Sequence, residues 1–305
     1  MDATKEPASG ACSTRAFGET PDHATNLRAA GLTALAVSIF AVSDAVVKLL
    51  ATVYPPGQIL FCRGVLACLC LLALIRWRHR AWQLPPLRDG AVWLRSLCDF
   101  GASLSFFSAL QRLPLAEATA VLFVFPLLLT GLAAVVLGER VGPARWAGVS
   151  VGLLGVLIIL RPGATTFDPA AVLALAAAAC IALRDLATRR VDPALGTESI
   201  ALVTMAFSTL ASLVTAPFGW RLPDALGALG FVGSAALTTF GFVAIVAGTR
   251  IGDISFTAPF RYAMVPLSFV LGYLIWGRIP DGLVLLGAAV VVLAGLSVLH
   301  RRPAR

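Results

Sequence analysis

The sequence is poor in charge and in the residues that usually hold metals. Only 13% of its 305 residues are charged, whereas roughly 25% is typical of soluble proteins. Its three histidines (His23, His79, His300) lie outside the apolar segments, and its six cysteines include no C-x-x-C pair. We therefore expect no metal site, no disulfide framework and no cofactor, with the cysteines acting as small packing residues.

What the sequence has in abundance is apolar length. Apolar residues make up 58% of the chain, and the mean hydropathy is +0.87. The net charge of +8 could suggest nucleic acid, but the basic residues cluster at the ends of apolar segments and form no basic domain. The expected partner is a lipid bilayer, not nucleic acid.

Ten apolar runs are long enough to span a membrane, for which about 17 to 25 residues are needed. Short connections rich in proline, glycine and aspartate separate them, which leaves no room for a soluble domain. The sequence predicts an all-α integral membrane protein with ten transmembrane helices. They are Ala29–Leu50, Ile59–Ile75, Ala91–Leu110, Ala116–Leu137, Ala144–Leu160, Ala170–Leu186, Ser199–Phe218, Ala225–Ala247, Ile254–Trp276 and Leu283–Leu299.

Both ends of the chain are expected in the cytoplasm. Residues 1–28 are polar and predict a disordered tail, and residues 301–305 a short second tail. If the N-terminus is cytoplasmic, 16 of the 24 Lys and Arg residues fall on the inner side and 4 on the outer side. This bias fixes the orientation in a bacterial inner membrane.

A weak internal repeat organises the chain. Arg112 to Arg140 reads as a polar turn, an apolar run with a proline and a charged exit, and Arg250 to Arg278 repeats that order 138 residues later. Five helices per half would insert the second half in the opposite sense. We therefore predict two inverted five-helix repeats, 29–162 and 169–300, an arrangement typical of transporters with a central site.

Prolines interrupt the helices that carry this repeat. Pro126, Pro259 and Pro266 each deprive a backbone carbonyl of its helical partner. They predict either simple kinks or helix hinges beside the substrate.

The fifth and tenth helices are rich in glycine. Gly148-x-x-x-Gly152 permits close backbone approach. It predicts that the two helices pack together or that they form the face of a homodimer.

Several motifs resemble those of the EamA family of the drug/metabolite transporter superfamily. They are Leu-Gly-Glu-Arg at 137–140, Gly-Val-Leu-Ile-Ile-Leu-Arg-Pro-Gly at 155–163, Ala-Pro-Phe-Arg-Tyr at 258–262, Asp-Ala-Val-Val-Lys at 44–48, Arg63, and Leu-Arg-Asp-Leu-Ala-Thr-Arg-Arg at 183–190. The resemblance covers residues 29 to 300. It implies proton-coupled or exchange-type movement of small metabolites through a cavity between the two halves, most often outward. Family members carry amino acids, nucleotide-like compounds, riboflavin, S-adenosylmethionine and opine-type metallophores, and the resemblance does not choose among them.

Ionisable side chains inside the membrane are the candidate site residues, because each costs at least about 2.5 kcal/mol to insert. Asp44 and Lys48 are four residues apart, as are Arg95 and Asp99, so each pair can meet on one helix face. Arg184 and Asp185 are adjacent and are not expected to face each other.

The intramembrane charges include a surplus of cations. Lys48, Arg63, Arg95 and Arg261 outnumber Asp44 and Asp99, which favours a substrate that carries a carboxylate or phosphate. The alternative for Lys48, Arg63, Arg95 and Arg184 is that they reach the lipid headgroups.

Arg261 is too deep in its segment to reach the headgroups easily, so we expect Arg261 and Tyr262 to line the cavity. Phe123 is the repeat equivalent of Arg261. We expect it to supply an apolar wall on the opposite side of the cavity.

Proton coupling requires a carboxylate that titrates inside a cavity, and Asp44 and Asp99 are the candidates. The function predicted is export of a small carboxylate-bearing or zwitterionic metabolite, amino-acid-like or opine-like. The alternatives are an importer of riboflavin or an S-adenosylmethionine-like compound, an intramembrane enzyme, and a non-transporting sensor or assembly subunit. An enzyme is disfavoured because no histidine and no carboxylate cluster with ligand spacing lies within a predicted transmembrane segment.

Overall fold

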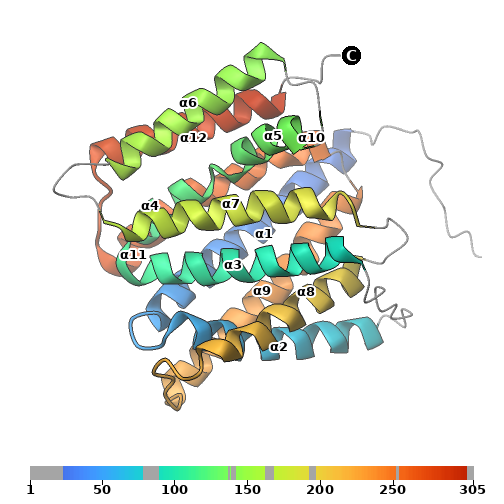
Figure 1. The fold of residues 1–305 in the computed structure, drawn as a ribbon, viewed down its shortest axis with the longest axis vertical. Coiled ribbons are helices and arrows are strands. Elements are labelled where there is room, and N and C mark those ends of the chain that lie inside the picture. Colours follow the sequence, from blue (N-terminus) through green and yellow to red (C-terminus); the bar gives the residue numbers. More distant parts are fainter. Residues whose placement is uncertain are drawn as a thin grey trace, which may run out of the picture.

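A computed structural model describes residues 23–77, 89–136, 138, 142–161, 168–191, 197–251 and 254–300. Every regular element in this part of the chain is helical, and the helices run alternately in opposite directions through one bundle (Figure 1). We call the face of the bundle that carries the start of α1 the N-side, and we call the opposite face the far side.

The first five spans agree closely with the predicted segments. α1 begins at His23, so residues 23–28 of the predicted tail are helical, while residues 1–22 lie outside the described part of the chain. The fourth span is split into two helices. The bounds are α1 His23–Leu50, α2 Pro56–Trp77, α3 Gly90–Arg112, α4 Leu115–Leu122, α5 Phe125–Val136 and α6 Pro143–Leu160.

The second five spans repeat this plan. The seventh span consists of α8 and ends in a short 3₁₀ turn, η1. The ninth span is divided into three pieces, α10, η2 and α11. The bounds are α7 Ala170–Thr188, α8 Thr197–Ser212, η1 Leu213–Thr215, α9 Ala225–Ile251, α10 Ile254–Thr257, η2 Ala258–Ala263, α11 Met264–Trp276 and α12 Gly282–His300. The predicted tail 301–305 is not among the described residues.

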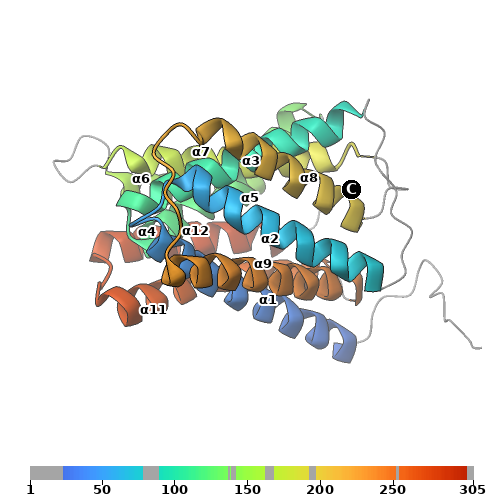
Figure 2. The same ribbon diagram turned by 90° about the horizontal axis from the view of Figure 1, so that it is seen from below.

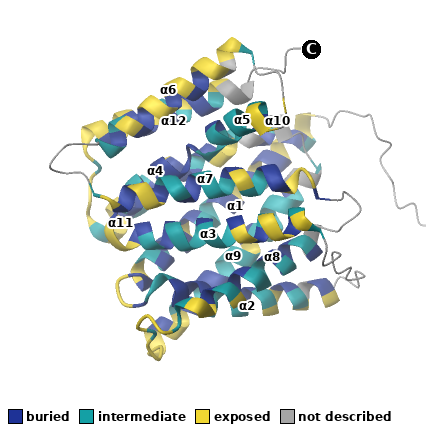
Figure 3. Ribbon diagram, viewed as in Figure 1, coloured by how far each residue is buried: buried dark blue, intermediate teal, exposed yellow. Residues whose placement is uncertain are grey.

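The surface of the bundle is apolar, as a bilayer requires. Leu154, Leu226 and Leu274 are 55%, 76% and 70% exposed, and the exposed positions lie along the outer faces of the helices (Figure 3). Within the described residues, five helical stretches meet the length and hydropathy of a membrane span: His23–Leu50, Pro56–Ala73, Leu115–Val136, Ala170–Thr188 and Ala225–Gly248. The chain is therefore a multi-pass membrane protein.

Helix packing has a regular order. The first span packs on the eighth (α1 on α9), and the sixth packs on the third (α7 on α3). The second pair is the first with the two halves exchanged, because spans 1 and 6 correspond, as do spans 3 and 8. α2 pairs with α8 and α6 with α12, and these two pairs lie at opposite edges of the bundle (Figures 1 and 2). An inverted repeat predicts this order. The division into repeats 29–162 and 169–300 stays a prediction that the packing supports.

Both proline-containing spans are interrupted. In the fourth span α4 ends at Leu122 and α5 starts at Phe125, one residue before Pro126. In the ninth span Pro259 lies in η2, and Pro266 lies in the first turn of α11. The missing proline N–H groups account for interruptions here. Movement at these breaks, and so a hinge role for the three prolines, stays a prediction.

Glycines bring α6 and α12 into close contact within the chain. A Cβ atom at Gly155 would lie 2.9 Å from the carbonyl oxygen of Gly287, and one at Gly287 would lie 2.6 Å from that of Gly155. A Cβ at Gly152 would meet Leu127 of α5. The two helices thus pack together, and the homodimer through their outer face stays a prediction.

Polar and aromatic contacts close the far side between α1–α2 and the segment before α9. The Tyr54 hydroxyl donates to Asp224 Oδ1 at 2.8 Å, and the Asp224 N–H donates to the Tyr54 oxygen at 3.3 Å. The Arg221 N–H donates to Gln58 Oε1 at 3.0 Å, and Gln58 Nε2 donates to the Arg221 carbonyl. We call these four residues the far-side latch.

Candidate functional site

A cavity of about 300 Å³ lies inside the bundle. Its size is at the lower limit for small-molecule sites. Charged, hydroxyl and aromatic side chains all reach it, although the helices that bear them are mostly apolar. The charged residues are Arg63, Arg95, Asp99 and Arg184; the hydroxyl residues are Ser103, Thr204, Ser208, Thr209 and Thr238; and the aromatic residues are Phe40, Phe107 and Phe242.

One row of α3 supplies a wall of this cavity. Arg95, Asp99, Ser103 and Phe107 are spaced by four residues and all line it, as side chains one turn apart share a helix face. The helix is fixed at its start by Asp89, whose carboxylate accepts the N–H of Ala91 at 2.9 Å. The sequence thus places Asp99 and Arg95 in one polar row.

Asp99 is held by a partner on the neighbouring helix α7. Arg184 Nη1 lies 3.0 Å from Asp99 Oδ1, and the Ser208 hydroxyl donates to Asp99 Oδ2 at 3.4 Å. The Arg184 guanidinium also folds back on Asp185, with Nη2 at 2.9 Å from Oδ1. The expectation that Arg184 and Asp185 cannot face each other was wrong, because the long arginine side chain can curl over its neighbour.

Among the described residues, Arg95 forms no hydrogen bond with Asp99. Its Nη1 donates to Thr188 Oγ1 at 2.9 Å, and its Nε is buried without a partner there. The spacing of Arg95 and Asp99 allowed an ion pair, but Arg184 occupies the carboxylate from across the helix interface.

Arg63 on α2 lines the cavity, and part of its guanidinium group has no hydrogen bond among the described residues. Its Nη1 is buried and finds no hydrogen-bond partner among the described residues. Its guanidinium carbon lies 5.4 Å from the centroid of the Phe107 ring, and Asp44 and Asp99 are both near enough to interact electrostatically. An arginine in this state is ready to bind an acceptor that enters the cavity.

Asp44 and Lys48 do not form the pair that their spacing permits. Asp44 is 9% exposed. Lys48 Nζ instead donates to the carbonyl oxygens of Leu110 and Leu113, at 2.9 and 2.6 Å, and lies 5.6 Å from the centroid of the Trp276 ring. Free carbonyls at the end of α3 attract the ammonium group, so Lys48 ties α1 to the end of α3 instead of pairing with Asp44.

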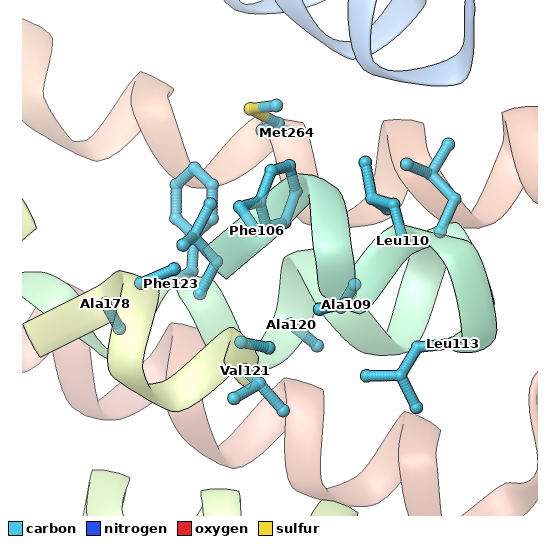
Figure 4. Close-up of a cluster of buried hydrophobic side chains, with 14 of the residues drawn as sticks. Phe106, Ala109, Leu110, Leu113, Ala120, Val121, Phe123, Ala178 and Met264 are labelled. Atoms are coloured by element: carbon cyan, nitrogen blue, oxygen red, sulfur yellow. The ribbon is translucent and has the colours of Figure 1, made fainter. Parts of the chain in front are cut away.

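Arg261, Tyr262 and Phe123 lie outside the lining of this cavity. Tyr262 is 3% exposed and Phe123 is 5% exposed, and their ring centroids are 5.6 Å apart. Figure 4 shows Phe123 in a cluster of buried apolar side chains that includes Phe106 and Met264. The fourth and ninth spans do face each other. At Phe123 and Tyr262, however, they are in direct contact and no cavity separates them.

Arg261 itself is exposed, and Arg184 and Asp185 lie within electrostatic range of it. Its predicted role as a substrate ligand stays a prediction. So do the roles predicted for Tyr262 and Phe123.

Neither the hydroxyl residues of α8 nor the role of Arg184 was predicted from the sequence. Thr204 and Ser208 are four residues apart, as are Met205 and Thr209, and all four line the cavity. A polar stripe on one face of an apolar helix is a signal that could have found them. Nothing in the sequence distinguishes Asp99 from Asp185 as the main partner of Arg184.

Comparison with known proteins decides the class of protein. The model of the EamA-like transporter family matches residues 27–161. A riboflavin transporter of Vibrio cholerae is 30% identical over 199 residues, which cover 65% of this chain and 67% of that protein. The chain belongs to the EamA-like transporter family.

Further relatives extend over most of the chain. A pseudopaline exporter, CntI, of Pseudomonas aeruginosa is 28% identical over 279 residues, with 88% of this chain and 94% of the relative covered. An S-adenosylmethionine uptake transporter of Rickettsia prowazekii is 25% identical over 261 residues, covering 85% and 88%. A solved crystal structure matches 90% of this chain with a TM-score of 0.63 at 25% identity. This EamA protein is therefore a membrane transporter of the drug/metabolite transporter superfamily.

Proposed function

We propose that this EamA protein is a secondary transporter of the bacterial inner membrane that moves a small carboxylate-bearing or zwitterionic metabolite. Export is the favoured direction, and alternating access of two inverted halves is the mechanism. The observation that carries the proposal is that Arg63, which lines the cavity, has a buried Nη1 without a hydrogen-bond partner among the described residues.

The charges of the cavity support a substrate with both signs of charge. Arg63 can bind a carboxylate through two parallel N–H bonds, and such bonds are strong where water is scarce. Arg184 is already occupied by two carboxylates, so it is a poorer anchor. Asp99, with the nearby hydroxyl of Ser208, can accept from an ammonium group on the same substrate.

Orientation and direction rest on separate support. The surplus of Lys and Arg in the N-side connections favours a cytoplasmic N-side. The pseudopaline exporter, which aligns over 94% of its length, supports export of an opine-like solute. No bond-breaking chemistry is assigned to the cavity, since the named relatives are transporters.

A second candidate is import of riboflavin or an S-adenosylmethionine-like compound. Phe40, Phe107 and Phe242 all line the cavity and could pack on an aromatic ring. Relatives named as a riboflavin transporter and an S-adenosylmethionine uptake transporter support this alternative.

Transport by the purified protein in lipid vesicles tests both candidates. The panel is a mixture of amino acids, an opine, riboflavin and S-adenosylmethionine, each offered from either face with a pH gradient of either sign. We expect a zwitterionic solute to move. Arg63→Gln should lower its transport at least about tenfold, because a charged hydrogen bond contributes about 1.5 to 3 kcal/mol.

Arg63→Lys separates charge from geometry, because lysine keeps the charge but loses the planar fork. We expect it to recover only part of the activity. Arg76→Gln is the matched control, since Arg76 is exposed at the end of the same helix. Wild-type transport of every active solute by Arg63→Gln would refute the proposal.

A further inference from the structure

A second cavity, of about 470 Å³, opens at the far side of the bundle. It lies where the ends of α1, α3 and α11 meet the start of α4, and these helix ends gather at one edge of the molecule (Figure 1). We call it the far-side cavity. Nothing described so far assigns it a ligand.

The far-side cavity is lined by charged groups, most of which form no ion pair among the described residues. Lys48 lines its wall, and Arg112, Arg278 and Glu117 also reach it. None of Arg112, Arg278 and Glu117 has an ion-pair partner among the described residues. Asp281 differs, because Arg161 Nη2 lies 2.5 Å from its Oδ2. The free charges are therefore cationic in surplus, with one carboxylate among them.

The first helix connects this cavity to the central one. Phe40 lines the central cavity, and Lys48 and Thr52 line the far-side cavity. Asp44 lies midway between Phe40 and Lys48, four residues from each, and is 9% exposed. Residues at this spacing form one row on a helix surface, so a single row of α1 passes from one cavity to the other.

The third helix repeats this relationship. Its cavity row of Ser103 and Phe107 continues to Gln111, and Gln111 lines the far-side cavity. Leu110, next to Gln111 in the chain, is 1% exposed, and its carbonyl accepts from Lys48. Two helices thus present continuous rows to both cavities.

We propose that the far-side cavity is a second solute-binding site on the transport path. It takes the same zwitterionic, carboxylate-bearing class as the central cavity, so this inference rests on the proposed function. A solute that enters from the far side is held there before it passes Leu110 and Lys48, and a solute that leaves is held there after it has passed them.

The geometry assigns separate parts of the solute to separate groups. Arg278 and Arg112 take the carboxylate, because guanidinium groups bind carboxylates in a bidentate manner. Glu117 takes the ammonium group. Trp276 forms an apolar and aromatic wall, against which Lys48 is already placed at 5.6 Å.

Transport measured separately from the two faces of the membrane tests the proposed site. We expect Arg278→Gln and Glu117→Gln each to raise the KM roughly tenfold when solute is offered from the far face, since each loses a charged hydrogen bond. The KM for solute offered from the N-side should change less than twofold. Arg28→Gln, which changes an exposed cation of the N-side, should change neither value. Equal changes from both faces, or no change, would overturn the proposal.

A second measurement does not depend on knowing the solute. A cysteine at position 111 (Gln111→Cys) is exposed to an anionic and a cationic methanethiosulfonate reagent, each impermeant, in right-side-out vesicles. We expect the anionic reagent to be favoured several-fold, relative to its reactivity with free cysteine, because nearby cations attract it.

That preference should disappear when Arg112→Gln and Arg278→Gln are added, and it should persist with Arg28→Gln, which changes an exposed cation of the N-side. Intact mass measured against the wild-type protein corrects for the native cysteines. An unreactive cysteine or no charge preference would overturn the assignment of this cavity. If no panel solute is transported while the charge preference is found, the proposed function fails and the charged cavity stands.

Discussion

Arg184 on α7 binds Asp99 on α3 with a separation of 3.0 Å between Nη1 and Oδ1. The same guanidinium binds Asp185, so one cation serves two carboxylates. Both partners of the Asp99 pair are about a quarter exposed on the cavity side, at 28% and 25%. A substrate ammonium group that approaches Asp99 therefore competes with a partner that has another carboxylate to retain.

The first prediction concerns this shared cation. Arg184→Gln leaves Asp99 without its charged partner, and we expect the free energy of unfolding to fall by about 1 to 3 kcal/mol. Asp99→Asn should cost less, because Arg184 keeps Asp185. Unfolding of the purified protein in mild detergent measures both values. The double variant should be less destabilised than the sum of the two changes, and strictly additive effects would contradict the pairing.

The second prediction concerns the close contact of α6 and α12. Gly155→Ala places a Cβ 2.9 Å from the Gly287 carbonyl oxygen, and backbone there cannot move without separating the helices. We expect a loss of about 1 to 3 kcal/mol, measured as a lower thermal unfolding midpoint. Gly131→Ala is the matched control, because nothing lies within 4 Å of its Cβ position. Equal midpoints for the two variants would show that the contact is not tight.

The third prediction concerns the pH range of the far-side latch. The hydrogen bond to Asp224 raises the pKa of Tyr54 above its usual value, and bonds from the Gly227 N–H and Tyr54 lower the pKa of Asp224. The Tyr54 contribution is complete below about pH 10 and is lost as pH rises through its raised pKa; the Asp224 contribution is complete above about pH 4 and is lost as pH falls through its lowered pKa. Between pH 5 and 9 the latch should not change.

Tyr54→Phe tests the latch because it removes the hydroxyl and keeps the ring. We expect faster labelling of a far-side cysteine at position 111 and an unaltered pH profile of that labelling between pH 5 and 9. A titration of the labelling rate near pH 6 in the Gln111→Cys protein that keeps Tyr54 would contradict this assignment.

The fourth prediction concerns proton coupling. Asp44→Asn and Asp99→Asn each remove a group that can carry a proton near Arg63, so each should abolish accumulation driven by a pH gradient. Exchange of solute at equal pH should survive in at least one variant, because exchange needs no net proton movement. Unchanged pH dependence in both variants would reject the two carboxylates as coupling groups.

Much of the fold was predictable because apolar length and turn chemistry are local properties. The predicted segment Ala170–Leu186 and the observed helix Ala170–Thr188 start at the same residue. The break beside Pro126 was also predictable, since proline lacks the N–H that a continuous helix needs.

The candidate site was less predictable, because it depends on which helices are neighbours. Arg95, Asp99 and Arg63 do meet at one cavity. The sequence could not show that Arg184 would reach Asp99 ahead of Arg95, since that choice is made across the α3–α7 interface. For the same reason Phe123 was expected to face a cavity, whereas Tyr262 packs directly against it.

The first helix runs without a break from His23 to Leu50, whereas the fourth and ninth spans are interrupted. Its one row of side chains lines both the central and the far-side cavity. Because α1 forms part of the wall of both cavities, it cannot tilt to widen one cavity without also moving the wall of the other. Movement of α1 therefore couples the opening of one cavity to the opening of the other, without a further element between them.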